Sequence, residues 1–255
     1  MCLILLARGA HRDYPLVIAA NRDEYYRRPT AKAAFWDDHP DILAGRDLEC
    51  MGTWLGVTRN GRFAALTNYR DPRERKTDAP SRGTLVSEFL VSGLEPRAYL
   101  DSVASRAQRY NGFNLLAGDV DGVFYLSSRS GAVQAVSPGI HGLSNHLLDT
   151  PWPKVQRGKA RLRAALADEP DAESLLNLLQ DREPAPENEL PDTGIGIEME
   201  RVLAPALIVS PQYGTRASTA VLFGSDGRVS FSERTILRDG AAGATVSMHF
   251  RVNRT

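Results

Sequence analysis

Short apolar runs alternate with polar turns along much of this chain. Residues 2–7 and 16–20 are two such runs on either side of a polar loop, a pattern that predicts a buried β-hairpin. Residues 53–58 and 62–67 flank an Asn-Gly pair, which is a strong signal for a second hairpin. The start of the chain is therefore expected at the end of a core strand, although chain termini are usually loosely held.

A wider apolar spacing, close to the period of the α-helix, predicts the helices. Apolar residues at 85, 86, 89 and 90 indicate a helix over 81–92. Similar patterns indicate helices over 96–109, 153–167 and 171–180, the last with Asp171 as its N-cap.

Further strands are predicted where Gly-containing turns separate short apolar runs. They are expected at residues 113–117, 123–127, 132–136, 140–144, 206–209, 217–223, 229–233 and 246–252. Because strands and helices follow one another in blocks, the pattern favours an α+β fold with antiparallel sheets and helices on their outer faces. A single domain over residues 1–255 is expected. Residues 181–203, rich in Pro, Glu and Gly, are predicted to form a long loop, and a loop of this length is usually a lid, a binding loop or disordered.

The composition argues against several classes of function. Lys and Arg number 31, as do Asp and Glu, so the net charge of zero gives no reason to expect nucleic acid as a partner. No apolar stretch approaches the roughly 18 residues needed for a transmembrane helix. The two cysteines do not make a disulfide framework, and we expect a soluble, cytoplasmic protein with reduced thiols. The five histidines lack metal-ligand spacing, so no metal site is expected.

Cys2 is the first candidate for chemistry. Removal of Met1 would leave a thiol and a free α-amine on one residue. An α-amine has a pKa of about 7.7–8.0, so it is partly neutral at pH 7 and can accept the proton of its own thiol. Many chains also begin Met-Cys without any such role.

Four consecutive polar residues, Asn21 to Glu24, follow the second apolar run. Here a carboxylate could hold the α-amine in place, and an arginine could favour the thiolate of Cys2. The same pattern is also typical of a solvated strand end. Asn68 and Asn145 are candidate hydrogen-bond donors to an oxyanion, although each also suits an ordinary turn.

Cys2, the Asn-Arg-Asp-Glu tetrapeptide at 21–24 and the Gly-Thr-Trp sequence at 52–54 together resemble the NRDE family, which is the family of the transport and Golgi organisation protein. The resemblance extends along nearly the whole chain. It continues through residues 67–70, 81–83, 142–145, 151–154, 190–194 and 213–216.

This resemblance implies a four-layer αββα sandwich of the N-terminal-nucleophile hydrolase type. It places Cys2 at the nucleophile of cysteine-type members, such as bile salt hydrolases and penicillin V acylases. It also implies that Asp23 is the acid near the nucleophile, Asn145 an oxyanion donor and Arg216 the late active-site arginine. We further expect substrate contacts from four polar side chains, namely Asn21, Arg22, Asn68 and Arg82.

The chain departs from those amidases at one position. They carry an arginine just before the asparagine, where this chain has Ala20 and places Arg22 after the asparagine instead. We expect the two positions to lie on different faces of the strand, so that Arg22 does a different job.

Two functions remain open, besides a fold that serves only for interaction. The first is a cysteine hydrolase that acts on a small non-peptide amide C–N bond and needs no cofactor. The second is a carrier on the same fold, since the NRDE family has been linked to haem movement and to acyl-CoA or lipid metabolism. Cys2 or a histidine would then be a haem ligand, or the Arg-rich segment 70–82 would meet acyl-CoA phosphates.

Overall fold

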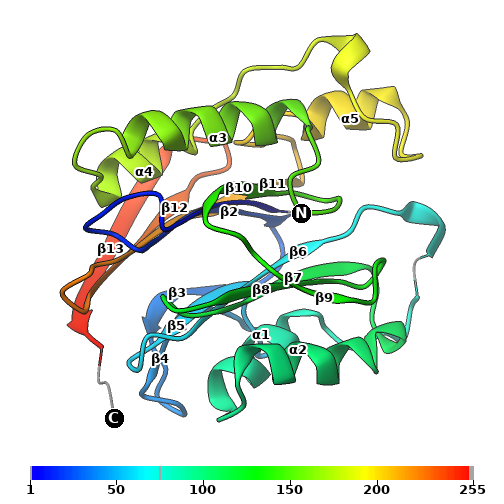
Figure 1. Cartoon of the computed structure of the whole chain (residues 1–255). Coiled ribbons are helices and arrows are strands. Elements are labelled where there is room, and N and C mark those ends of the chain that lie inside the picture. Colours follow the sequence, from blue (N-terminus) through cyan, green and yellow to red (C-terminus); the bar gives the residue numbers. More distant parts are fainter. Residues whose placement is uncertain (1, 75, 253–255) are drawn as a thin grey trace.

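The computed structural model describes residues 2–74 and 76–252, and in it two antiparallel sheets lie face to face (Figure 1). The first sheet has the strand order β10-β1-β2-β11-β12-β13. Its strands are β1 (Cys2–Arg8), β2 (Leu16–Tyr25), β10 (Gly139–Leu143), β11 (Tyr213–Phe223), β12 (Arg228–Ile236) and β13 (Ala242–Arg251).

The second sheet runs in simple chain order from β3 to β9. Its strands are β3 (Thr30–Phe35), β4 (Ile42–Asp47), β5 (Leu55–Thr58), β6 (Phe63–Asn68), β7 (Phe113–Gly118), β8 (Val123–Ser127) and β9 (Val133–Ala135). The helices are α1 (Gly83–Val91), α2 (Pro96–Ala104), α3 (Pro153–Ala165), α4 (Ala172–Leu178) and α5 (Ile197–Leu203), with short 3₁₀ turns at Pro72–Glu74, Ala107–Arg109 and Glu187–Glu189.

Three apolar clusters hold four layers together. One lies between the sheets, a second lies under α1 and α2, and a third lies under α3 and α4. The apolar run of strand β2 is continuous because the strand is covered on both faces. Leu16, Ile18 and Ala20 face the other sheet, while Val17 and Ala19 face the helices. The α+β fold and its αββα layering are therefore confirmed.

Both predicted hairpins are present, and the first pairs Cys2 with Arg22 across β1 and β2. Asp171 caps α4 and accepts a hydrogen bond from the backbone of Ser174, as predicted. Strand β2 is longer than predicted, since it continues through the polar tetrapeptide to Tyr25. It lies between β1 and β11, so both of its edges pair even where its side chains are polar.

The structure differs from the predicted elements in three places. Residues 206–209 were expected as a strand, but only an isolated bridge from Val209 to Gly214 is formed there. Strands β3 and β4 were not predicted at all, because β3 buries only Ala33 and β4 contains Gly45 and Arg46 within its apolar run. The segment 181–203 is not one long loop, since it contains a 3₁₀ turn and α5.

Glu200 on α5 anchors this segment to the rest of the fold. Its Oε2 accepts a hydrogen bond from Arg70 Nη1 at 2.5 Å, and its Oε1 accepts one from the backbone N–H of Thr193 at 3.0 Å. Both side chains of the ion pair are almost completely buried, at 5% and 3% exposed. A buried pair of this kind is costly to break because one charge stays behind without its partner. In the part of the chain that the structure describes, no helix is long and apolar enough to cross a bilayer.

We predict that Glu200→Gln destabilises the protein by about 3–5 kcal/mol, since it removes the carboxylate to which the buried Arg70 guanidinium donates. Urea unfolding followed by circular dichroism measures the change. The matched control is Glu198→Gln on the same helix, where the side chain is 80% exposed and paired with Arg201. It should cost less than about 1 kcal/mol. Equal effects of the two substitutions would show that the buried pair does not anchor α5.

Candidate functional site

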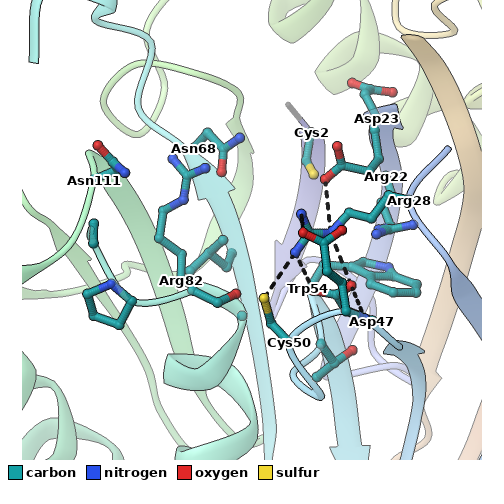
Figure 2. A pocket seen from close by; sticks show the side chains of 18 of the residues that line it. Cys2, Arg22, Asp23, Arg28, Asp47, Cys50, Trp54, Asn68, Arg82 and Asn111 are labelled. Carbon is teal, nitrogen blue, oxygen red and sulfur yellow. Dashed lines mark hydrogen bonds and ion pairs between the residues drawn. The ribbon is translucent and has the colours of Figure 1, made fainter. Parts of the chain in front are cut away.

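A cavity of about 730 Å³, called here the front cavity, opens where β1 begins and β6 ends (Figure 2). Five of the eight site residues expected from the sequence line it: Cys2, Arg22, Asp23, Asn68 and Arg82. Figure 2 shows Cys2 and Arg28 on one side and Arg82 with Asn111 on the other. The other three expected residues, Asn21, Asn145 and Arg216, do not line it.

Close backbone packing explains how two glycine-containing motifs shape this cavity. A Cβ on Gly52 would meet the backbone carbon of Gly83 at 2.6 Å, so only glycine permits this approach. The backbone N–H of Thr53 then donates to the carbonyl of Gly83. This contact fixes the start of α1 against the segment before β5, and it brings Arg82 and Trp54 to the same cavity.

Cys2 lies at the first position of β1, and Ser144 Oγ donates a hydrogen bond to its carbonyl at 3.3 Å. Burial raises the pKa of the thiol, because a thiolate is poorly solvated there, while the nearby Arg22 acts in the opposite direction. The thiol is therefore neutral at pH 7 and needs a base before it can act as a nucleophile. The predicted removal of Met1 concerns a residue outside the described part of the chain.

Asp23 is buried on the face of β2 that is opposite to the Arg22 side chain. There, Thr215 Oγ1 donates a hydrogen bond to Asp23 Oδ1 at 2.7 Å. Burial raises the pKa of this carboxyl, and the nearby Lys154 ammonium opposes the shift. Lys154 is itself buried, with its Nζ donating to the carbonyl of Leu203 at 2.8 Å, and burial lowers its pKa to about 8. The acid and the lysine thus compensate part of each other's charge beneath Cys2.

Asn21 and Asn145 use their amide groups within the fold. Asn21 Nδ2 donates to the carbonyls of Leu179 and Ala206, at 3.0 and 2.8 Å. Asn145 is fully buried, and its Nδ2 donates to the carbonyl of Asn68 at 3.0 Å. In this arrangement Asn145 holds the end of β6, where Asn68 lines the front cavity.

Arg22 projects between the two sheets, on the same face of β2 as Ala20. The expectation that these two positions lie on different faces is wrong, because they are two residues apart and side chains alternate with a period of two. Arg22 is only 5% exposed, and its guanidinium carbon lies 4.1 Å from the centroid of the Trp54 ring. Its Nη1 donates to Thr30 Oγ1 at 2.9 Å.

Arg216 sits at a β-bulge in β11, between Thr215 and Ala217. Its Nη1 donates to the carbonyls of Tyr25 and Arg28, at 2.9 and 3.1 Å. The bulge directs this side chain toward a second, smaller cavity beyond Arg22, rather than toward Cys2.

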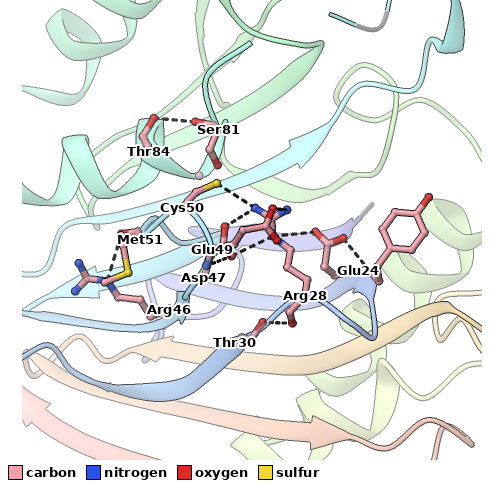
Figure 3. Close-up of polar contacts among 12 residues, drawn as sticks. Glu24, Arg28, Thr30, Arg46, Asp47, Glu49, Cys50, Met51, Ser81 and Thr84 are labelled. Carbon is pink, nitrogen blue, oxygen red and sulfur yellow. Dashed lines mark hydrogen bonds and ion pairs between the residues drawn. The ribbon is translucent and has the colours of Figure 1, made fainter. Parts of the chain in front are cut away.

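No pattern in the sequence indicates the ion-pair network around Arg28, which Figure 3 shows. Its guanidinium makes two hydrogen bonds to Asp47, at 3.0 and 2.7 Å, and lies 3.5 Å from a Glu49 oxygen and 3.9 Å from a Glu24 oxygen. It also donates to Cys50 Sγ at 3.5 Å. This arginine is therefore fully compensated, and the contacts across it place a second thiol in the front cavity.

Arg82 and Arg22 differ from Arg28 in their charge balance. Arg82 Nη1 donates to the carbonyl of Gly112 at 3.0 Å. Across residues 2–74 and 76–252, neither Arg22 nor Arg82 makes an ion pair, and burial lowers the pKa of both. Two desolvated guanidinium groups without a direct ion pair among the described residues therefore face one cavity and can accept an anionic ligand. The same described residues contain no cluster of His, Cys, Asp or Glu that could hold a metal ion.

Comparison with known proteins covers most of the chain. Residues 1–238 match the family model described as Transport and Golgi organisation 2. A Transport and Golgi organization protein 2 homolog from Bos taurus is 39% identical over 267 residues, which cover 94% of this chain and 93% of the relative. The Transport and Golgi organization protein 2 of Drosophila melanogaster is 27% identical, with 92% of each chain covered.

Among solved structures, the mutant C2A conjugated bile acid hydrolase from Clostridium perfringens has the same kind of fold. The TM-score is 0.50 at 8% sequence identity, and the match covers 99% of this chain and 98% of the hydrolase. At this identity the likeness concerns the fold, which is of the N-terminal-nucleophile hydrolase type.

We predict that Arg22→Gln raises the pKa of the Cys2 thiol further, because the loss of a nearby positive charge disfavours the thiolate. The rate of Cys2 alkylation by iodoacetamide, followed by mass spectrometry against pH in a Cys50→Ser background, measures this shift. The rate at pH 8 should fall. Arg27→Gln, which removes an exposed charge from the turn that follows β2, is the control and should leave the profile unchanged. An identical profile for Arg22→Gln would contradict the assigned electrostatic coupling.

Proposed function

The chain belongs to the Transport and Golgi organisation 2 family, and from its cavity we propose a cysteine N-terminal-nucleophile hydrolase that cleaves an amide C–N bond in a small anionic molecule. The observation that carries this proposal is the position of Cys2. Its thiol lines a cavity that also holds two guanidinium groups without ion-pair partners. An amide substrate bearing a carboxylate or phosphate would satisfy both features.

The proposed reaction begins after loss of Met1. The α-amine of Cys2 takes the thiol proton, and the thiolate forms a bond to the amide carbon. Asn68, which lines the cavity, is the candidate donor to the oxyanion, because the Asn145 amide already donates to the Asn68 carbonyl. The C–N bond then breaks, and the leaving amine takes the proton from the α-ammonium. Water hydrolyses the thioester and restores the thiol.

The residues around Cys2 have separate roles in this proposal. Arg22 favours the thiolate, since its charge opposes the effect of burial. Asp23 and Lys154 form a buried polar support beneath the strand end, with Asp23 held by Thr215. Arg82 is assigned to the anionic group of the substrate, across the cavity from the thiol.

A carrier of haem or acyl-CoA is the second candidate, and the burial that keeps Cys2 neutral favours it, because a neutral thiol is a weak nucleophile. For haem, the Cys2 and Cys50 thiols are the candidate ligands that line the front cavity. For acyl-CoA, Lys76 and Arg82 lie in the same lining and suit phosphate groups.

We predict that Cys2→Ser lowers kcat/KM for amide hydrolysis by at least about a hundredfold, because the reacting nucleophile is replaced by a weaker one. Intact mass spectrometry first establishes whether Met1 is absent, and a panel of N-acyl amino acids is then assayed for release of the amine. Cys50→Ser is the control thiol and should keep its activity. Undiminished turnover in Cys2→Ser would refute the nucleophile. Retained Met1 together with a Soret shift on haem addition would support the carrier instead.

We also predict that Arg82→Met removes the preference for an anionic substrate. The native protein should hydrolyse an N-acyl amino acid at least about tenfold faster, in kcat/KM, than its uncharged methyl ester, because a desolvated guanidinium–carboxylate pair is lost in the ester. In the Met variant the two substrates should react at similar rates. Arg73→Met, which alters an exposed arginine paired with Asp71, is the control. A preference that survives Arg82→Met would place the anion elsewhere.

A further inference from the structure

A second cavity of about 330 Å³, called here the rear cavity, lies on the far side of Arg22 and Trp54. These two residues line both cavities, so their stacked side chains form the wall between them. Strands β3, β11 and β12 supply most of the remaining lining. No step of the proposed hydrolysis uses this space.

Glu233 on β12 is a buried carboxyl group that lines the rear cavity. Its side chain lies on the same inner face as Phe231, and the residue is only 4% exposed. Its Oε1 accepts a hydrogen bond from the backbone N–H of Ala33 at 2.8 Å. Its Oε2 is buried and has no hydrogen-bond partner among the described residues. Buried polar atoms are normally paired, so this oxygen indicates a missing ligand.

The charges around Glu233 indicate which kind of ligand is missing. Four cationic side chains line the rear cavity, namely Arg22, Lys32, Arg216 and Arg238. None of the four makes an ion pair within the part of the chain that the structure describes. Among the described residues that line this cavity, Glu233 is the only acidic one. An ammonium ligand would be repelled by this set, whereas an anion would be attracted.

We propose that the rear cavity binds the anionic group of a small molecule, a carboxylate or a phosphate, between the guanidinium groups of Arg22 and Arg216, with the protonated carboxyl of Glu233 donating a hydrogen bond from Oε2. Arg216 uses Nη1 for the carbonyls of Tyr25 and Arg28, which fixes the plane of its guanidinium and leaves its other nitrogens available. A carboxylic acid that donates to an anion satisfies the orphaned oxygen without a second negative charge.

The protonation state of Glu233 fits this role at neutral pH. Burial raises its pKa to about 7, so the acid form is well populated there. The charged groups that face it are Arg22 from β2, Lys32 from β3 and Arg216 from β11, and all are cationic. A bound anion would oppose their effect and favour the proton on Glu233 further.

The test is a calorimetric titration of the purified protein with sulfate, which keeps its charge between pH 6 and pH 8 and represents a phosphate group. Acetate is titrated in parallel as the carboxylate probe. The probe that binds with the lower Kd shows whether the site prefers a tetrahedral anion, such as phosphate, or a planar carboxylate. We expect saturable binding that weakens by about tenfold from pH 6 to pH 8, because Glu233 must carry a proton in the complex.

Three variants locate the binding event. Glu233→Gln keeps a hydrogen-bond donor at every pH, so its affinity should hardly change between pH 6 and pH 8. Arg216→Ala should weaken binding at pH 6 by at least about tenfold through the loss of a charged donor. Arg82→Met removes a guanidinium from the front cavity alone, so the pH-dependent component of anion binding, which requires Glu233, should remain in this variant.

The outcomes decide the proposal without reference to any hydrolysis. Absence of saturable binding by both probes would overturn it. A pH dependence that persists unchanged in the near-isosteric Glu233→Gln would overturn the role of the carboxyl group. Loss of binding in Arg82→Met, but not in Arg216→Ala, would place the anion in the front cavity and also overturn it. A thermal melt of each variant confirms that it is folded before titration.

Discussion

The alternation of side chains along β2 is the constraint on which the whole site depends. Successive residues of a strand point to opposite faces, and β2 is covered by a layer on each side. The polar tetrapeptide therefore divides its side chains between two environments. Arg22 projects between the sheets, while Asn21 and Asp23 project toward the helices. One insertion or deletion in this strand would exchange the two sets and bury each in the wrong layer.

Buried charges on the two sides of β2 differ in whether they are compensated by neighbouring charges. The compensated groups stabilise the fold, and the others are candidates for ligand binding. On the helix side, Asp23 faces Lys154, and Arg70 pairs with Glu200. These charges compensate one another, so they stabilise the arrangement around the strand end once all partners are in place. Between the sheets, Arg22 has no ion pair and Glu233 keeps an oxygen without a partner among the described residues. Such groups persist in a fold when something else compensates them, which is the physical reason to assign ligands there.

The sequence was sufficient to predict those parts of the fold that depend on local patterns. The first hairpin, the Asp171 cap and the αββα layering follow from apolar spacing, turn residues and the family resemblance. It was insufficient for β3 and β4, whose side chains are largely polar or small and which exist because neighbouring strands pair with them. The same limit applies to the site. Five of the predicted site residues line one cavity, namely Cys2, Arg22, Asp23, Asn68 and Arg82. No local pattern, however, indicates the Arg28 network, the Arg216 bulge or the burial of Glu233.

The wall shared by the two cavities links their chemistry. Arg22 favours the thiolate of Cys2 from one side, and the same guanidinium lines the rear cavity on the other. An anion bound in the rear would neutralise part of that charge, so it would make the thiolate less favourable. By thermodynamic reciprocity, ionisation of Cys2 would weaken the binding of that anion to the same extent. Arg22 thus couples the two cavities through its single charge, and no movement of the backbone is required for that coupling.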